Sequence, residues 1–227
     1  MTSIRVDRKY LLSRRTSEEV LAATQSHWMP DAVAHDLTQR YETDYFDTDD
    51  LHLFHAARRQ RPQRSKIRVR HYINTGTAFI EVKSRNSRGE TAKVRQAWTG
   101  EINDAHDFLL GALHGSAELV ERLVPTSRTT YERTAASMVD GGRMTLDRKL
   151  LVGNHSFTHR LGDGSDDLIV LETKSAGQGP TAIDRHMWDQ HIRPVALSKY
   201  ALAVASFCPE LPFGRWTSAT SKLRPNS

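Results

Sequence analysis

The chain has 227 residues, of which 38% are hydrophobic and 26% are charged, and its 32 lysines and arginines outnumber its 27 acidic residues, giving a net charge of +5. A chain of this length buries roughly 70 to 75% of its unfolded surface, so its core needs no metal or disulfide. The positive charge favours an anionic partner, such as nucleic acid, an acidic membrane surface or a phosphorylated small molecule.

Cysteine content and hydropathy limit the cellular setting. Cys208 is the only cysteine, which excludes an internal disulfide and favours a reducing compartment. No apolar run approaches the roughly 18 residues of a membrane span, and the N-terminus has no hydrophobic signal-peptide segment. We therefore expect a soluble cytoplasmic protein.

Eight segments show either the alternation of polar and apolar residues or the high content of β-branched and aromatic residues that is typical of strands. In chain order, the predicted strands cover residues 4–13, 41–47, 66–72, 77–83, 91–98, 128–137, 143–150 and 168–174. Tight turns at Asn74-Thr75-Gly76 and Gly141-Gly142 favour antiparallel pairing between neighbours. The sequence therefore predicts an antiparallel sheet or barrel.

Helical segments are predicted between these strands. They cover residues 16–28, 51–54, 102–113, 116–123, 182–192 and 198–207. Thr16 is the predicted N-cap of the first helix, with Glu19 as its capping-box partner. We expect one α+β domain over residues 1–208 and an irregular C-terminal tail over residues 209–227, which is rich in Pro, Ser and Thr.

The segment 66–72 shows the feature on which the functional prediction depends. Lys66, Arg68 and Arg70 point to one face of the strand, and Ile67 and Val69 point to the other. Other strands repeat the pattern. Their charged faces carry Asp7 and Lys9, Glu81 and Lys83, Lys93 and Arg95, Tyr131 and Arg133, Arg143 and Asp147, and Glu172 and Lys174.

Two arrangements account for these faces. In the first, they form a solvated outer surface, although such surfaces mix Glu, Gln, Ser and Thr with Lys. In the second, a closed eight-stranded antiparallel barrel holds the charges inside, where there is room for one small ligand. Two cations about 5 Å apart repel by roughly 3 kcal/mol at an effective dielectric near 20. A triphosphate would offset this repulsion through charge-assisted hydrogen bonds, and the acids could hold a divalent metal.

Histidines, tryptophans and Asp47 also suggest possible metal-binding or structural sites. His52 with His55, and His155 with His159, have spacings that could ligate zinc, but no third ligand stands at a recognisable spacing, which favours structural or exposed roles. The four tryptophans are predicted to pack in the core or at its edge. Asp47 is predicted to cap a turn.

Several short motifs resemble the VTC domain, the catalytic domain of the vacuolar transporter chaperone complex, which belongs to the triphosphate tunnel metalloenzymes. The motifs are Arg8-Lys9-Tyr10, Tyr45-Phe46-Asp47-Thr48, Lys66-Ile67-Arg68-Val69-Arg70, Phe79-Ile80-Glu81-Val82-Lys83, Tyr131-Glu132-Arg133, Leu171-Glu172-Thr173-Lys174 and Ser198-Lys199-Tyr200. Their order and facing over residues 4 to 207 carry the resemblance. It implies an antiparallel tunnel with flanking helices.

The resemblance and the shared facing of side chains together give an expected site. Its catalytic residues are Arg68, Arg70, Arg133 and Lys199; its phosphate-binding residues are Lys9, Lys66, Lys83, Lys93, Arg95, Tyr131, Lys174 and Ser198; its metal ligands are Glu172, Glu81 and Asp147. The first strand departs from the Glu-x-Lys of related enzymes, because Asp7 is one methylene shorter than glutamate. That difference argues for contact through water rather than direct ligation.

The implied function is polyphosphate synthesis from the γ-phosphate of ATP with Mn²⁺ or Mg²⁺. Partners would be ATP, triphosphate or polyphosphate, with no nucleic acid. The sequence lacks the phosphate-sensing domain and membrane segments of fungal versions, so we expect a free enzyme or a separate membrane partner. The alternatives are an inorganic or nucleoside triphosphatase, and a non-catalytic protein that binds polyphosphate or nucleic acid.

Overall fold

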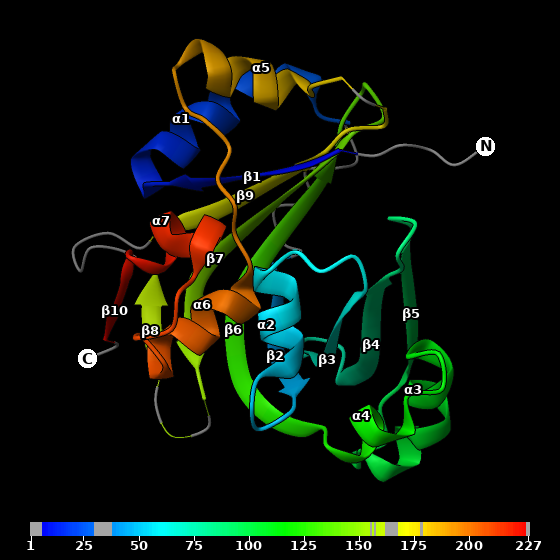
Figure 1. The fold of residues 1–227 in the computed structure, drawn as a ribbon. Coiled ribbons are helices and arrows are strands. Elements are labelled where there is room, and N and C mark those ends of the chain that lie inside the picture. Colours follow the sequence, from blue (N-terminus) through cyan, green and yellow to red (C-terminus); the bar gives the residue numbers. More distant parts are fainter. Residues whose placement is uncertain are drawn as a thin grey trace.

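One antiparallel sheet organises the fold of the computed structural model, which describes residues 6–29, 38–154, 156, 158–161, 168–177 and 179–225 (Figure 1). From edge to edge its order is β1 (Asp7–Leu12), β9 (Ile169–Lys174), β7 (Arg143–Gly153), β6 (Val124–Ser137), β2 (Gln39–Asp47), β3 (Arg64–Tyr72), β4 (Thr77–Arg85) and β5 (Thr91–Ala97). These are the eight predicted strands, with some ends shifted; residues 4 and 5 of the first lie outside the described part. The α+β class is confirmed.

Two short strands add to the prediction. β8 (Thr158–Leu161) pairs with β7, and β10 (Leu223–Pro225) pairs with β8. They were missed because each is four residues or shorter, which leaves too few positions for an alternating pattern to be recognised.

The sheet does not close into the expected barrel. β1 and β5 stand at the two ends of the strand order, and no hydrogen-bonded ladder joins them among the residues described. Beside β1, the Val195 N–H donates to the Lys9 carbonyl oxygen at 2.8 Å, so a connecting segment bonds to this edge strand instead. β5 is exposed along its whole length. The sheet curves into a trough, with β1 and β9 across from β4 and β5 (Figure 1).

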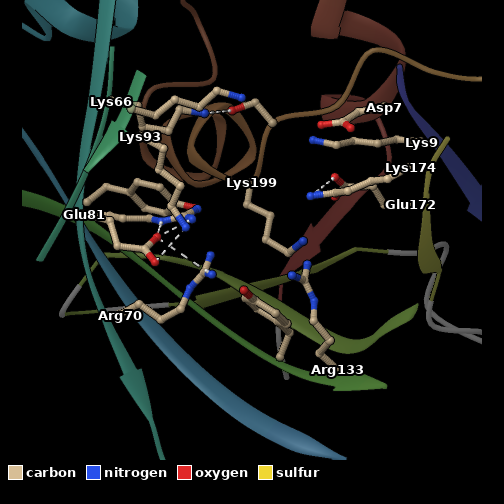
Figure 2. Close-up of a pocket in the computed structure, with 15 residues that line it drawn as sticks. Asp7, Lys9, Lys66, Arg70, Glu81, Lys93, Arg133, Glu172, Lys174 and Lys199 are labelled. Carbon is tan, nitrogen blue, oxygen red and sulfur yellow. Dashed lines mark hydrogen bonds and ion pairs between the residues drawn. The ribbon is translucent and has the colours of Figure 1, made fainter. Parts of the chain in front are cut away.

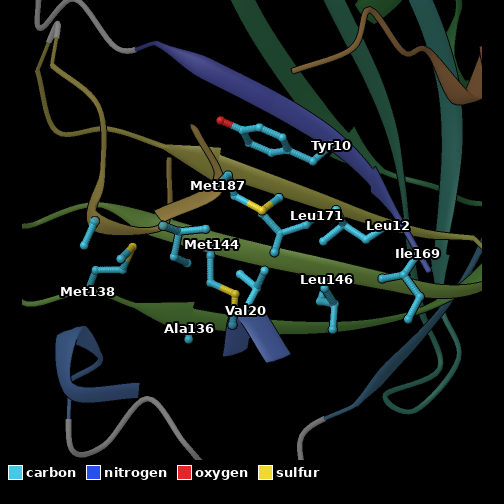
Figure 3. Close-up of a cluster of buried hydrophobic side chains, with 12 residues drawn as sticks. Tyr10, Leu12, Val20, Ala136, Met138, Met144, Leu146, Ile169, Leu171 and Met187 are labelled. Carbon is cyan, nitrogen blue, oxygen red and sulfur yellow. The ribbon is translucent and has the colours of Figure 1, made fainter. Parts of the chain in front are cut away.

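An apolar cluster covers one half of the outer face. Tyr10, Leu146 and Leu171 point outward from β1, β7 and β9 because they alternate with the charged positions. They pack against Val20 of α1 (Arg14–Thr24) and Met187 of α5 (Ala182–Asp189), as Figure 3 shows. A 3₁₀ turn, η1 (Gln25–His27), follows α1.

A second cluster covers the other half of the outer face. Ile67 of β3 and Val82 of β4 meet Leu109 of α3 (His106–Ala112) and Val120 of α4 (Ala117–Glu121). The 3₁₀ turn η3 (Asn103–Ala105) leads into α3. The outer face is therefore apolar and helix-covered, which leaves the charged positions on the concave face.

Helices also fill one end of the concave side. Tyr200 of α6 (Lys199–Phe207) stacks on Tyr45 with ring centroids 5.0 Å apart and meets Phe54 of α2 (His52–Arg58) edge-on. Leu202 of α6 packs against Tyr131 and other residues of the sheet. α6 thereby brings its N-terminus to the middle of the trough.

The helix caps differ in part from prediction. The Ser13 hydroxyl, not that of Thr16, caps α1 by accepting the Thr16 N–H at 3.1 Å, and Glu19 accepts from Arg15 instead. The helix starts earlier because Ser13 directly follows the strand. Asp47, predicted to cap a turn, instead caps the first turn of α2, because its carboxylate accepts the N–H groups of Leu53 and Phe54, each at 2.8 Å.

The expected irregular tail is structured in the described residues. It forms the 3₁₀ turn η4 (Gly214–Trp216), α7 (Thr217–Thr220) and β10. Trp216 is only 5% exposed, and its ring lies 6.0 Å from that of Phe54. The apolar residues of the tail are widely spaced among Ser, Thr and Pro, so the sequence pattern did not predict this packing. The other tryptophans also pack against core clusters, as expected. No helix in the described part is long and apolar enough to cross a membrane.

Candidate active site

The concave face encloses a cavity of about 260 Å³ that is lined mainly by charged side chains (Figure 2). The lining residues are Asp7, Lys9, Tyr45, Lys66, Arg68, Arg70, Glu81, Lys83, Lys93, Tyr131, Arg133, Glu172, Lys174, Ser198 and Lys199. Seven strands contribute to it, and α6 contributes Lys199. The cations on these strands therefore converge on a shared interior rather than dispersing over the surface.

Strand register places like charges directly opposite one another. Lys66 of β3 faces Lys83 of β4, and Lys83 in turn faces Lys93 of β5. Cross-strand pairs of the same sign are destabilising. A row of three lysines across three neighbouring strands therefore costs stability in the free protein and indicates that the face is built to hold an anion.

Burial and mutual repulsion weaken the hold of these lysines on their protons. Burial lowers the pKa of Lys66 well below its usual range, and the neighbouring cations Lys9 and Arg68 lower it further. Burial likewise lowers the pKa of Lys9 and of Lys83. Because an anion in the cavity would relieve the repulsion, its binding should raise these pKa values.

Two carboxylates compensate part of this charge and fix the arginines. Glu81 accepts two hydrogen bonds from Arg68, at 2.6 and 2.8 Å, and one from Lys93 at 3.1 Å. Burial by itself would raise the pKa of Glu81, but Arg68 and Arg70 outweigh it and hold the pKa at about 2. Glu81 is therefore a charged acceptor whose two oxygens are already engaged.

Asp147 does the same on the concave face at the β6–β7 side of the trough. It is fully buried, accepts from Arg133 at 2.5 and 2.7 Å, and also accepts from the Lys199 ammonium. Burial would raise its pKa, but Lys199 and Arg133 hold the pKa at about 2. Asp147 does not line the cavity, so it orients two cations that do.

Polar atoms without a partner point to a missing ligand. The Tyr131 hydroxyl is buried and unpartnered, and so is Nε of Arg70. The Arg133 guanidinium and the Lys199 ammonium lie 5.2 and 4.5 Å from the Tyr131 ring centroid. Buried polar groups are nearly always hydrogen-bonded, so donors left free in a cationic cavity fit an absent anion.

The N-terminus of α6 closes one side of the cavity. The Ser198 hydroxyl caps the helix by accepting the Ala201 N–H at 3.3 Å, and it also accepts from the Lys66 ammonium at 3.0 Å. Lys199 follows directly and reaches the cavity. Partial positive charge at a helix N-terminus adds to the attraction for anions.

Glu172 is the carboxylate best placed for a divalent metal. It lines the cavity, and its closest cation is Lys174 at 3.4 Å. Burial would raise its pKa, but Lys9 and Lys174 lower it, so the group is ionised. Asp7 lines the same cavity. No group of three His, Cys, Asp or Glu residues in the described chain could hold a metal alone, so phosphate oxygens would have to complete its coordination.

Most of the expected site residues meet in this cavity, although their roles remain predictions. Arg95 and Asp147 are the two that do not line it. Arg95 lies on the exposed edge strand β5, with its guanidinium 4.7 Å from the Phe79 ring centroid. Tyr45 lines the cavity but was not among the expected residues. The signal available in the sequence was the motif Tyr45-Phe46-Asp47-Thr48, and the structure sets Tyr45 opposite Arg68 in the β2–β3 register. His155 lies outside the described residues.

Comparison with known proteins agrees with this geometry. A family model described as VTC domain matches residues 4–208. A putative adenylate cyclase from Bacillus halodurans is similar in structure, with a TM-score of 0.57 and 15% identity over 90% of this chain and 97% of that one. A putative adenylyl cyclase from Hippeastrum, described as revealing a dominant triphosphatase activity, gives a TM-score of 0.50 and 16% identity over 89% of this chain and 96% of that one. No curated protein matches the sequence.

Replacing Asp147 by asparagine should destabilise the protein. The substitution leaves the partly buried Arg133 and Lys199 side chains without their counter-charge, and the loss of one partner of a buried pair costs up to about 5 kcal/mol. The free energy of unfolding from urea titration measures the effect. Asp107→Asn on α3, whose side chain is fully exposed, is the matched control and should stay within about 0.5 kcal/mol of the wild type. An equally small change for Asp147→Asn would contradict its compensating role.

Proposed function

Because this chain belongs to the VTC domain family, we propose that its cavity transfers the γ-phosphate of ATP to a phosphate chain in a metal-dependent reaction. The observation that carries the proposal is the convergence of six lysines and three arginines on one cavity in which the Tyr131 hydroxyl lacks a partner. Phosphoryl transfer needs positioning and charge neutralisation more than covalent help, and this cavity supplies both.

The roles of the side chains follow from their chemistry. Arg70 and Arg133 would bind phosphate oxygens through their forked donors, and Arg68, held by Glu81, would contribute its remaining N–H groups. The lysines would act as point charges, and the hydroxyls of Tyr131 and Ser198 would add hydrogen bonds. In the reaction, the bond from the γ-phosphorus to the bridging oxygen of ADP breaks. A terminal oxygen of the acceptor chain forms the new bond.

Glu172, with Asp7 nearby, would hold the divalent metal together with substrate phosphates. A bound metal would supply further neutralisation of the charge on the phosphate oxygens. Glu81 and Asp147, expected as ligands from sequence, fit this role less well because cations engage both oxygens of each. We assign both to positioning: Glu81 holds Arg68 and Lys93, and Asp147 holds Arg133 and Lys199.

Two alternatives use the same cavity or the same charge. With water as acceptor, the protein would be a triphosphatase, which is the activity named for the similar Hippeastrum structure. A nucleic-acid-binding protein would need exposed aromatic rings as stacking platforms, whereas Tyr45 and Tyr131 in this cavity are buried. The acceptor of the phosphate, a chain or water, distinguishes a polymerase from a triphosphatase. Preference for tripolyphosphate over an oligonucleotide distinguishes both enzymes from a nucleic-acid-binding protein.

The first prediction from the proposed function concerns products and ligands. Purified protein given ATP labelled at the γ-phosphate, with Mn²⁺ or Mg²⁺, should form labelled chains longer than triphosphate. Tripolyphosphate at about 100 times its Kd should stabilise the protein by about 2.7 kcal/mol, which is a rise of roughly 5 to 10 °C in melting temperature. An oligonucleotide of equal charge should do much less. Labelled inorganic phosphate without chains would instead identify a triphosphatase.

The second prediction concerns Glu172. Glu172→Ala should lower turnover by about 10² to 10³ and raise the metal concentration needed for half-maximal activity, while circular dichroism stays unchanged. Glu132→Ala is the matched control, because this carboxylate pairs with the exposed Lys149 outside the cavity. It should leave both quantities near the wild-type values. Normal turnover and metal dependence in Glu172→Ala would remove this carboxylate from the mechanism.

The third prediction concerns protons. The lowered pKa of Lys66 and Lys9 means that part of the lysine charge is lost at alkaline pH in the free protein. Tripolyphosphate should restore that charge, so binding should take up protons, and affinity should fall as pH rises toward the usual lysine pKa. Calorimetry in two alkaline buffers of different ionisation enthalpy measures the uptake. Lys66→Met should reduce it and Lys149→Met should not; proton release would contradict the model of relieved repulsion.

A further inference from the structure

The row of cations on the concave face continues past the cavity. Arg64 and Arg85 lie directly opposite each other, two residues before Lys66 on β3 and two residues after Lys83 on β4. Two residues of strand span about 6.6 Å and restore the same facing. The arginine pair therefore extends the face of the lysine row, but neither arginine lines the cavity.

Two adjoining hollows stand at this outer end. One, of about 240 Å³, is lined in part by Arg64 and Arg85. The other, of about 600 Å³, is lined in part by Arg59 and Arg61. Both include Pro62 and Ser87, so they meet along the turn between α2 and β3.

Charge at this end is positive and uncompensated by the lining. Among the residues described, no carboxylate lines either hollow. Burial lowers the pKa of Arg64, and the neighbouring guanidinium groups of Arg85 and Arg215 add to the effect. Arg64 is further fixed by donating to the Arg61 carbonyl oxygen at 2.6 Å. The guanidinium groups of Arg64 and Arg85 are thus held near each other with no carboxylate in the described lining, whereas the cavity has three.

The described linings of the cavity and of the hollows share no residue, so the link between them is the strand register, which sets Arg64 and Arg85 next to the lysine row. The helix α6 packs on β6, β7 and β8, whereas Arg59, Arg61 and Arg85, on the β3–β4 side, are exposed. An extended anion that outgrows the cavity toward this end would therefore meet the arginines next. The hollows have no Phe, Tyr or Trp in their described lining, so they lack platforms for nucleobases.

We propose that Arg59, Arg61, Arg64 and Arg85 form a second anion-binding site, next to the lysine row of the cavity along β3 and β4, that holds the stretch of a linear polyphosphate chain lying beyond the units in the cavity. The inference rests on the proposed function, because it assumes that the cavity binds phosphate chains. It adds that the protein grips long chains outside the cavity, so its affinity depends on chain length.

The test compares a short and a long ligand. Arg61→Gln combined with Arg85→Gln removes two exposed guanidinium groups and spares Arg64, which is partly buried. Tripolyphosphate should bind this variant with the wild-type Kd, because it fits within the cavity. A linear polyphosphate tens of units long should bind roughly 10-fold more weakly, and the slope of log affinity against log salt should fall by about 2, one for each lost phosphate contact.

Matched variants distinguish binding at this site from a general effect of the protein's net charge. Arg14→Gln combined with Arg15→Gln removes the same charge from the exposed side of α1, on the outer face, and should leave both affinities unchanged. Arg61→Lys combined with Arg85→Lys should recover most of the long-chain affinity. Equal melting temperatures would show that all of these variants are folded.

Other outcomes would overturn the proposal. Wild-type long-chain affinity in the Arg61→Gln, Arg85→Gln variant would remove the site, and so would an equal loss in the α1 control. An equal loss of binding to an oligonucleotide of the same charge would show a general polyanion surface instead. Failure of the wild type to bind tripolyphosphate would reject the proposed function itself, and the long-chain comparison can be read separately from that result.

Discussion

The structure depends on keeping like charges together in a partly buried space. Lys66, Lys83 and Lys93 face one another across three strands, and no local pairing satisfies all of them. The protein offsets part of the repulsion with two carboxylates, each of which accepts from one arginine and one lysine. What remains is an electrostatic cost in the free protein that an anion removes on binding. Affinity and instability therefore have the same physical origin.

The division of the sheet into two faces makes this arrangement tolerable. The outer face buries apolar side chains under two groups of helices, one over each half of the sheet, so these clusters form without residues of the concave face. Tyr10, Leu146 and Leu171 stabilise the same strands that carry Lys9, Asp147 and Glu172 on their other side. Because successive side chains point to opposite faces, one strand serves both purposes. Apolar burial thus stabilises the fold against the repulsion in its interior.

Alternation predicted the eight longer strands and the residues that share their charged faces, because facing depends only on local spacing. It left open whether those faces point into an interior or to solvent. Closure was not predictable in this way. Whether β1 pairs with β5 or bonds to the segment at Val195 depends on contacts between residues far apart in the chain. The same limit explains Asp147, whose charged face suggested a metal ligand. Only the register between β6 and β7, which sets it opposite Arg133, shows that its oxygens already have partners.

Asp47 links the helix beside the outer hollow to the helix beside the cavity. Its carboxylate accepts N–H groups of α2 and also the Tyr200 hydroxyl at 2.5 Å, and Tyr200 follows Lys199 in the chain. α2 carries His52 and His55, which border the larger outer hollow. One buried side chain thus connects the helix at the hollow to the helix that places a lysine in the cavity. If a ligand at the hollow displaced α2 far enough to move Lys199, thermodynamic linkage would require occupancy of the cavity to alter affinity at the hollow by the same factor.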